Sequence, residues 1–232
     1  MCGFNIAGPK SREMLQRLSN QDLSNNNWPF MHSGQLSIAG VECLALRISF
    51  SGDLGWEIYC DAEYQEIIYK TLIKASIIEN GGPVGSRALM SLRIEKGYGS
   101  WSREYSPEVW PHESGLEKLC KLDKDFLNKR ALVENLKNEP RERLVLIKLD
   151  EQDCKKSNAD ATGGEPIFYS GKGIGRITSG AYGYNVGMSL ALGYVKDVSA
   201  GDTVDVMVLG EPHKGKILKA PPFDPEGKIL RG

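Results

Sequence analysis

The chain has 232 residues, 41% of them hydrophobic and 25% charged, and its 29 basic and 30 acidic residues almost cancel. These proportions are typical of a globular protein with one large or two modest domains. The balanced charge, without Lys/Arg runs among aromatic residues, argues against nucleic acid as a partner. No apolar run approaches the ~20 residues that would span a bilayer, so we expect no membrane partner either.

The first part of the chain predicts alternating strands and helices. The expected elements are a strand over 3–7, a helix carrying Met14, Leu15 and Leu18, strands over 35–38 and 41–50, a strand from Trp56, a helix over 62–78 and a helix over 86–95. Ala39-Gly40 favours a hairpin between the second and third strands. Asp61 is a plausible N-cap of the long helix. The apolar residues of that helix predict one buried face formed by Tyr64, Ile67, Ile68, Leu72 and Ile73.

From about residue 139 the pattern changes to short strands bounded by Gly, Pro or Asp. They are expected at 144–149, 166–169, 173–178, 190–194, 203–209 and 215–219. Such spacing favours a small barrel or a sandwich. A helix over 128–140 is the expected boundary, which predicts domains 1–138 and 139–232 and an α+β fold followed by a small C-terminal β-barrel. Gly171–Gly175 is glycine-rich but enters a strand, so it predicts a hairpin turn and not a phosphate loop.

Cysteine and histidine residues give little sign of metal or nucleophilic chemistry. The five cysteines are odd in number, widely spaced and never in C-x-x-C form, which supports neither a disulfide framework nor a zinc site. The three histidines are also far apart. We therefore expect reduced thiols, and a location in the cytoplasm or, in a eukaryote, in the mitochondrial matrix.

The segment Ser51–Tyr59 contains the most informative carboxylate. Two glycines flank Asp53-Leu54 and permit a tight turn with positive φ, and the strand that follows alternates Trp56 and Ile58 with Glu57. A fixed carboxylate there could accept two parallel N–H bonds from a planar amidine-like edge, such as that of a pterin or a guanine. A solvated Glu on the outer face of a half-buried strand is the plainer alternative.

A second candidate constellation follows the helix over 86–95. It combines fixed charge with flat apolar surface, as a ring-containing anion would require. Its members are Arg87, Arg93, Glu95, Trp101, Trp110 and Glu113. An ordinary ion pair and packed tryptophans are the alternative for each of them taken singly.

Several motifs in a fixed order resemble the glycine-cleavage T-protein (aminomethyltransferase) superfamily along nearly the whole chain. They are Ala7–Glu13 (AGPKSRE), Ile48–Glu57 (ISFSGDLGWE), Ser91–Gly97 (SLRIEKG), Pro111–Leu116 (PHESGL), Thr178–Gly180 (TSG) and Asp224–Gly227 (DPEG). Within the superfamily, Trp28–Met31 and Leu122–Phe126 resemble the C-terminal folate-binding region of dimethylglycine and sarcosine dehydrogenases. A relative that acts in iron–sulfur cluster maintenance and RNA modification would show a K-G-C-Y-x-G-Q-E-like motif, which this sequence lacks.

The resemblance implies a tetrahydrofolate site. Glu57 matches the family glutamate that grips the pterin, and Arg87 matches an arginine that helps to hold folate. Phe50 stands where the family has a tyrosine, so a ring contact could be kept but not a hydroxyl bond. Glu113 matches a family glutamate whose role here we leave open. The family's catalytic aspartate lies on an upstream segment that these residues lack, so no catalytic residue is assigned and the fold is expected to be truncated.

Two functions are therefore expected as alternatives. The first is the folate half of a dimethylglycine or sarcosine dehydrogenase-type enzyme, with folate and an amine as small-molecule partners and FAD only on a missing domain or partner subunit. The second is a non-catalytic remnant that docks through an exposed sheet edge onto another subunit or onto itself.

Overall fold

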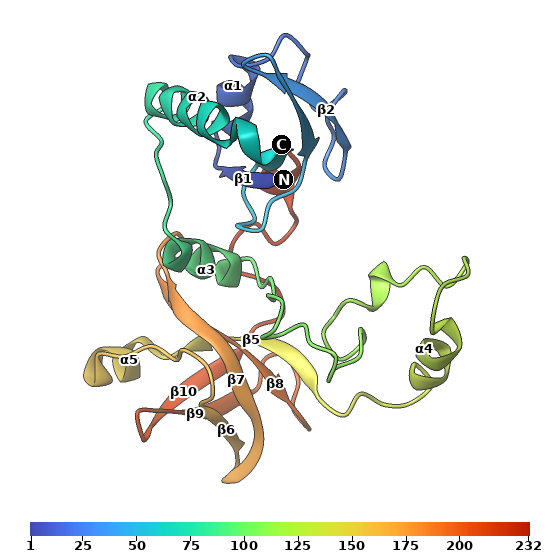
Figure 1. The fold of residues 1–232 in the computed structure, drawn as a ribbon. Coiled ribbons are helices and arrows are strands. Elements are labelled where there is room, and N and C mark those ends of the chain that lie inside the picture. The colour runs from blue at the N-terminus through green and yellow to red at the C-terminus, as the bar shows by residue number, and fades with distance from the viewer. The chain divides into compact units, whose positions relative to one another are not determined.

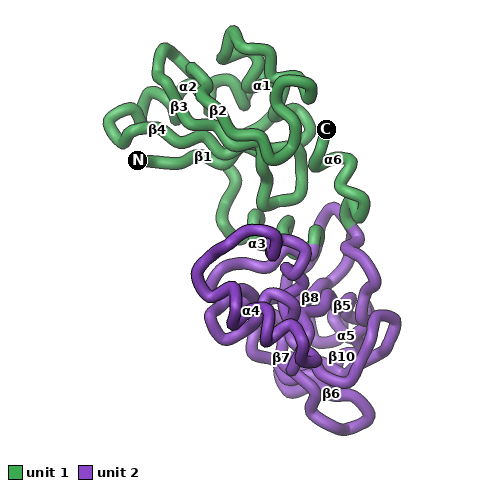
Figure 2. Tube along the Cα trace, turned by 90° about the vertical axis from the view of Figure 1, so that its right-hand side faces the viewer, with its two compact units in different colours: residues 1–96, 223–232 green, residues 97–222 purple.

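The computed structural model describes residues 1–232 and divides into two compact units (Figure 2). Unit 1 comprises Met1–Lys96 and Phe223–Gly232, and unit 2 comprises Gly97–Pro222. The C-terminal residues thus pack with the N-terminal part of the chain. These units show where contacts concentrate, and the domain limits expected from composition, 1–138 and 139–232, stay a prediction.

Unit 1 is a four-stranded antiparallel sheet, in the order β1-β4-β3-β2, packed against helices (Figure 1). Its elements are β1 (Cys2–Ala7), α1 (Ser11–Gln16), β2 (Ser33–Ile38), β3 (Val41–Leu46), β4 (Gly55–Cys60), the 3₁₀ helix η1 (Ala62–Tyr64), α2 (Gln65–Ile78), α3 (Ser86–Glu95) and α6 (Lys228–Arg231). Trp56 and Ile58 on the inner face of β4 share a core with Leu15 of α1 and with Ile68 and Leu72 of α2. The alternation in the sequence therefore selects which face of β4 is buried.

The predicted hairpin between β2 and β3 is confirmed, with Ala39 and Gly40 at φ of 52° and 78°. Two positive φ values suit the right-handed twist of the paired strands. The third strand was predicted too long, because β3 ends at Leu46 and not at Phe50. Just beyond it, the guanidinium of Arg47 is buried and donates to the carbonyls of Gly55 and Leu230, at 3.1 Å and 2.9 Å.

The helix predicted over 62–78 forms, but its first turn is the 3₁₀ helix η1. Asp61 is the N-cap residue, as predicted, but its side chain makes no capping hydrogen bond. The buried face was also partly misassigned, since Tyr64 and Ile67 are 40% and 47% exposed while Ala75 is buried. The sheet covers a narrower stripe of the helix than its apolar residues suggest.

Unit 2 is built around a closed six-stranded barrel in the order β10-β5-β8-β7-β6-β9. Its elements are η2 (Glu117–Leu119), α4 (Lys129–Asn135), β5 (Arg143–Leu149), α5 (Glu151–Ser157), β6 (Pro166–Tyr169), β7 (Lys172–Gly183), β8 (Met188–Val195), β9 (Thr203–Val208) and β10 (Glu211–Ile217). Because the sheet closes on itself, the predicted alternative of a barrel is correct and that of a sandwich is not. The closed sheet has no open edge. The predicted α+β class with a C-terminal barrel is confirmed.

The glycine-rich segment 171–175 begins in the hairpin turn between β6 and β7, as predicted, and continues as the start of β7. Ser170 and Gly171 form the turn at φ of 49° and 78°. Gly175 is required for a different reason, because a Cβ on it would lie 1.9 Å from the carbonyl oxygen of Tyr194 on β8. The glycines thus serve strand pairing in the barrel. No helix in residues 1–232 has the length and apolar character needed to cross a membrane.

Candidate functional site

The turn that leads into β4 is fixed by two glycines with different roles. Gly52 has a φ of +88°, and a Cβ on it would lie 2.7 Å from Cγ of Lys96. Gly55 has ordinary dihedrals, but a Cβ there would lie 2.8 Å from the carbonyl oxygen of Ile6 on β1. The first glycine allows the backbone to reverse, and the second allows β1 and β4 to approach closely.

Polar contacts hold this turn from two sides. The carbonyl oxygen of Leu54 accepts hydrogen bonds from the Gly8 amide and the Ser11 hydroxyl, at 2.9 Å and 2.8 Å. On the other side, Lys96 Nζ lies 2.9 Å from Oδ2 of Asp224, and both side chains are only 5% exposed. The entry into β4 is therefore constrained before any ligand binds.

The outer face of the sheet carries the candidate carboxylate. The strand register aligns Asn5, Glu57 and Leu46 in one row across β1, β4 and β3, and the next row contains Gly3, Tyr59 and Leu44. Glu57 and Tyr59 are half-buried, whereas Trp56, Ile58 and Cys60 on the opposite face are buried. The prediction that Glu57 projects away from Trp56 and Ile58 is confirmed.

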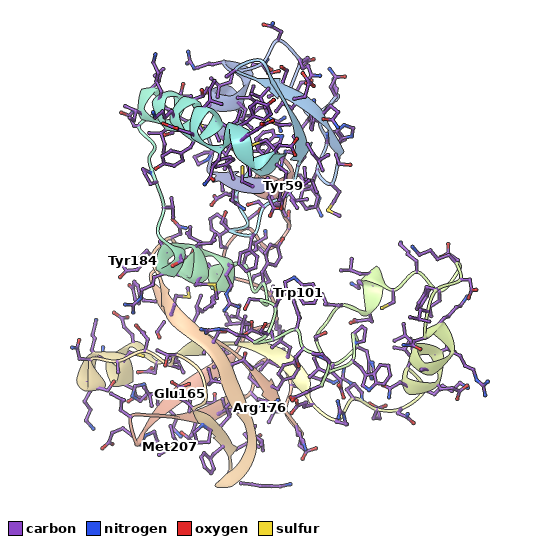
Figure 3. The ribbon with its side chains drawn as sticks, viewed as in Figure 1. Tyr59, Trp101, Glu165, Arg176, Tyr184 and Met207 are labelled. Atoms are coloured by element: carbon purple, nitrogen blue, oxygen red, sulfur yellow. The ribbon has the colours of Figure 1, made fainter.

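Tyr59 holds Glu57 in place. Its hydroxyl donates to Oε2 of Glu57 at 2.5 Å, and this hydrogen bond, with burial as a smaller cause, raises the pKa of Tyr59. The tyrosine ring covers Gly3, where a Cβ would lie 2.8 Å from the ring carbon Cε1. Oε1 of Glu57 has no hydrogen-bond or ion-pair partner in the chain. Figure 3 labels Tyr59 on unit 1. The sheet therefore presents an ordered carboxylate with one oxygen that has no partner in the chain.

The other two residues expected at this site make no hydrogen bond or ion pair with Glu57 or Tyr59. Phe50 is half-buried in the irregular segment between β3 and the turn. Arg87 is exposed in the first turn of α3, and it makes no hydrogen bond or ion pair with Glu57 or Phe50. Tyr59 was not among the predicted site residues. Its position two residues after Glu57 on one strand was the available signal, because side chains at that spacing share a face.

The predicted series of charges and aromatic rings is divided between the two units. Arg93 and Glu95 belong to unit 1, and both are buried at the end of α3. In unit 2, Trp101 is 82% exposed and packs edge-on against Tyr105, with ring centroids 5.9 Å apart.

Glu113 is a buried anchor within unit 2. Its carboxylate accepts two hydrogen bonds from the Arg141 guanidinium, both at 2.8 Å, and others from the backbone amides of Trp110 and Arg141. The Arg141 side chain, followed by these amides, lowers the pKa of Glu113 to about 2 against the opposing effect of burial. A carboxylate whose oxygens are so occupied has a clear structural role.

The fold also brings together a cysteine and a histidine that are far apart in the sequence. Sγ of Cys154 on α5 lies 3.8 Å from Nδ1 of His213 on β10. Burial is the main reason that the pKa of the Cys154 thiol is raised, so the pair is unlike an activated thiolate. No group of three His, Cys, Asp or Glu side chains in residues 1–232 is arranged to hold a metal ion.

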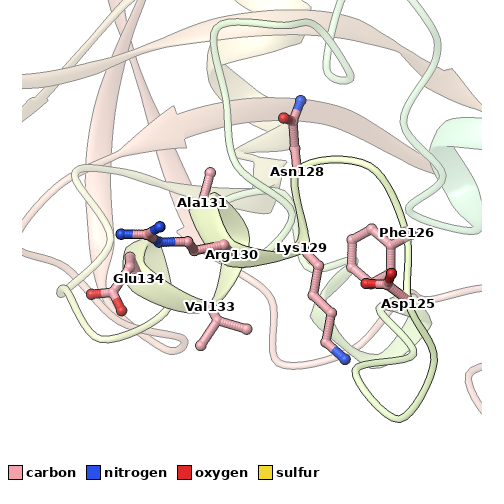
Figure 4. A pocket seen from close by; sticks show the side chains of 8 residues that line it. All are labelled: Asp125, Phe126, Asn128, Lys129, Arg130, Ala131, Val133 and Glu134. Atoms are coloured by element: carbon pink, nitrogen blue, oxygen red, sulfur yellow. The ribbon is translucent and has the colours of Figure 1, made fainter.

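A hollow of about 770 Å³ lies around α4 (Figure 4). Its lining comes from one short segment of unit 2. The lining residues are Asp125, Phe126, Asn128, Lys129, Arg130, Ala131, Val133 and Glu134. Glu57, Phe50 and Arg87 all belong to unit 1, and none of them lines this hollow.

Comparison with known proteins places the chain in a family. The model of the GCVT N-terminal domain matches residues 1–124, and that of the glycine cleavage T-protein C-terminal barrel domain matches residues 142–224. Mitochondrial dimethylglycine dehydrogenase of Mus musculus is 36% identical over 93% of this chain and 25% of its own length. Mitochondrial sarcosine dehydrogenase of Mus musculus is 31% identical over 99% of the chain and 26% of its own length.

A shorter relative and a solved structure agree. Aminomethyltransferase of Desulfitobacterium hafniense is 31% identical over 92% of this chain and 57% of its own length. The crystal structure of glycine cleavage system aminomethyltransferase T from Bartonella henselae matches 94% of the chain with a TM-score of 0.80 and 22% identity, and the chain covers 58% of it. The chain thus spans about a quarter of the dehydrogenases and little more than half of the aminomethyltransferases. Both halves of the family description match in order, and the protein belongs to the glycine cleavage T-protein family.

Proposed function

We propose that these residues form the tetrahydrofolate-binding part of a dimethylglycine or sarcosine dehydrogenase-type enzyme, which passes a one-carbon unit from a secondary or tertiary amine to folate. The observation that carries the proposal is the Glu57 carboxylate, which the Tyr59 hydroxyl orders on the half-buried outer face of the sheet. Family membership and the similarity to dimethylglycine and sarcosine dehydrogenases support it.

The side chains present fit a pterin. The pterin ring offers adjacent N–H donors along one edge, and a carboxylate accepts such a pair more strongly than a neutral group does. Glu57 has one oxygen without a protein partner, and the oxygen that accepts from Tyr59 retains a second lone pair. Phe50 would offer a ring surface, and the exposed guanidinium of Arg87 would attract the anionic glutamate tail of folate.

Bound tetrahydrofolate would supply a nitrogen nucleophile that takes up a carbon at the oxidation level of formaldehyde. Glu57 would orient the pterin, and its restricted motion would favour a reactive geometry mainly through proximity. We assign no proton-transfer role to this chain. Oxidation of the amine requires FAD, which we place on another domain or a partner subunit.

Titration calorimetry with tetrahydrofolate, under anaerobic conditions, tests the proposal. Glu57→Ala should weaken binding at least about tenfold, the loss expected when a charged hydrogen bond is removed. Glu42→Ala is the matched control, because Glu42 is an exposed carboxylate on β3 of the same sheet. No binding by either this chain or a longer version of the protein would refute the proposal, as would binding that Glu57→Ala leaves unchanged.

The position of β1 favours the second candidate, a non-catalytic subunit or interaction module. β1 is an edge strand paired only with β4, so its other backbone edge can receive a strand from a partner or from a second copy. Size-exclusion chromatography with light scattering distinguishes the cases. Self-association that Ala7→Pro disrupts would support the module, and a monomer that binds folate would exclude it as the main role.

A further inference from the structure

Two cysteines face each other across the edge of the sheet in unit 1. Cys2 on β1 and Cys60 on β4 are direct cross-strand partners, and their Sγ atoms are 3.3 Å apart. Directly opposed residues in an antiparallel pair have Cα atoms about 4.5–5.5 Å apart, which lies within the range that a disulfide spans. Both thiols are free, and closing the bond requires only a small movement of the sulfur atoms.

The two thiols have different surroundings. Cys2 is half-buried near the beginning of an edge strand, where a small oxidant can reach it. Cys60 is 4% exposed, and burial, together with the Cys2 thiol, raises its pKa to about 12. Because Cys2 is the more exposed of the two thiols, it is suited to react with the oxidant first, and Cys60, whose sulfur lies against it, is placed to attack it in the second step. Cys43 on β3 is buried and also interacts with Cys60, so it is the thiol that competes with Cys2 for a bridge to Cys60. Burial raises the pKa of Cys43 as well.

We propose that Cys2 and Cys60 form a redox modification site that closes to a disulfide on reaction with a peroxide. The thiolate of Cys2 attacks one peroxide oxygen, the O–O bond breaks, and the departing oxygen takes up a proton as water or an alcohol. Cys2 is then a sulfenic acid. The sulfur of Cys60 loses its proton and attacks Cys2 Sγ, the S–O bond breaks, and water leaves.

The two thiols together lose two electrons, and the peroxide gains them. A small thiol reductant reverses the reaction by thiol–disulfide exchange. The bridge would tie the edge strand β1 to β4 through side chains 58 positions apart in the sequence. Because β1 is hydrogen-bonded on one side only, the bond should mainly suppress its local opening. This inference does not depend on folate binding.

Hydrogen peroxide is the probe, applied to the reduced chain, with alkylation of remaining thiols and peptide mass spectrometry without reductant. The expected product is one linked pair of peptides that contain Cys2 and Cys60, absent in Cys2→Ser and retained in Cys120→Ser. Cys120 is a matched control because it is also half-buried, but in unit 2. Oxidation should also raise Tm by about 5 °C, as expected for a bridge that constrains the unfolded chain.

Three results would overturn the inference. One is a dominant bridge between Cys43 and Cys60, and another is a mixture that links Cys120 or Cys154 at a similar yield. The third is oxidation of Cys2 to sulfinic acid without any bridge. Cys60→Ser should also remove the linked pair, but its buried position could prevent folding. In that case Cys2→Ser still decides the outcome, because a half-buried residue tolerates the substitution.

Discussion

Replacing Tyr59 by Phe tests whether the proposed pterin carboxylate is positioned by its neighbour on β4. The change removes one hydroxyl and keeps the ring that covers Gly3. A hydrogen bond to a charged group contributes about 1.5–3 kcal/mol, and exposure reduces this for the half-buried pair to about 1 kcal/mol. Ordering a freed Glu57 on binding costs a similar amount. We therefore expect about fivefold weaker tetrahydrofolate binding.

A double-mutant cycle separates positioning from general damage to the sheet. Glu57→Gln should weaken binding by about 2–3 kcal/mol, because the neutral amide offers one acceptor and no charge. In that background, Tyr59→Phe should have less than about a twofold further effect, since there is no carboxylate left to orient. Calorimetry on the four variants gives a coupling energy of about 1 kcal/mol if the reasoning holds.

A control substitution and a second ligand test whether the effect of Tyr59→Phe is specific to Glu57. Tyr69→Phe alters a tyrosine that is 49% exposed on α2 and should leave the affinity unchanged. A pterin analogue that lacks the 2-amino donor should bind wild type and Tyr59→Phe equally, because it cannot donate that hydrogen bond to Glu57. Additive effects of the two substitutions, or equal losses for both ligands, would show that Tyr59 is only part of the packing.

Two further substitutions test the anchors described above. Glu113→Gln should lower the free energy of unfolding by about 2 kcal/mol at pH 7, because Arg141 loses its charged acceptor. The pKa of Glu113 is lowered to about 2, so this stabilisation is present above the ordinary glutamate range and is lost as pH falls toward 2. Urea melts at pH 7 and pH 3 should show the gap between wild type and variant narrowing, and a gap independent of pH would contradict the assignment. Gly52→Ala should cost about 1–3 kcal/mol through its φ of +88° and the contact with Lys96, whereas Gly82→Ala, with open space around it, should change stability by less than about 0.5 kcal/mol. Similar melts for these two variants would show that the turn does not require glycine at position 52.

The parts of the fold that were predicted correctly depend on local pattern. Strand alternation from Trp56, the helix over 86–95 and the short strands of unit 2 all follow from side-chain period and turn residues. The early end of β3 could not be predicted in this way. It coincides with the burial of Arg47 against carbonyls of Gly55 and of Leu230, a residue far away in the sequence. Contacts of that kind depend on the tertiary fold and leave no local pattern.

The same division applies to the candidate site. The sequence placed Glu57 on the less buried face of a strand, while the roles expected for Phe50 and Arg87 rested on family resemblance and stay predictions. The hydrogen bond from Tyr59 to Glu57 could have been predicted from the rule that alternate residues of a strand share a face, had we asked which neighbour holds the carboxylate. The contact of Cys2 with Cys60 could be predicted only from the register of β1 and β4, and the spacing of the cysteines in the sequence does not indicate that register.

The position of Glu57 is the reason that we propose a binding role for this carboxylate among the 30 acidic residues. β4 is an interior strand, paired with Asn5 and Leu46 on either side of Glu57, so its backbone cannot shift without breaking two ladders. Tyr59 then fixes the side chain, and the turn at Gly52 fixes the start of the strand. Each constraint is met in folding and not in ligand binding, which is how a preorganised site avoids the entropy cost of ordering a contact. An exposed strand carboxylate such as Glu42 has no comparable support, so the comparison of Glu57→Ala with Glu42→Ala measures preorganisation together with charge.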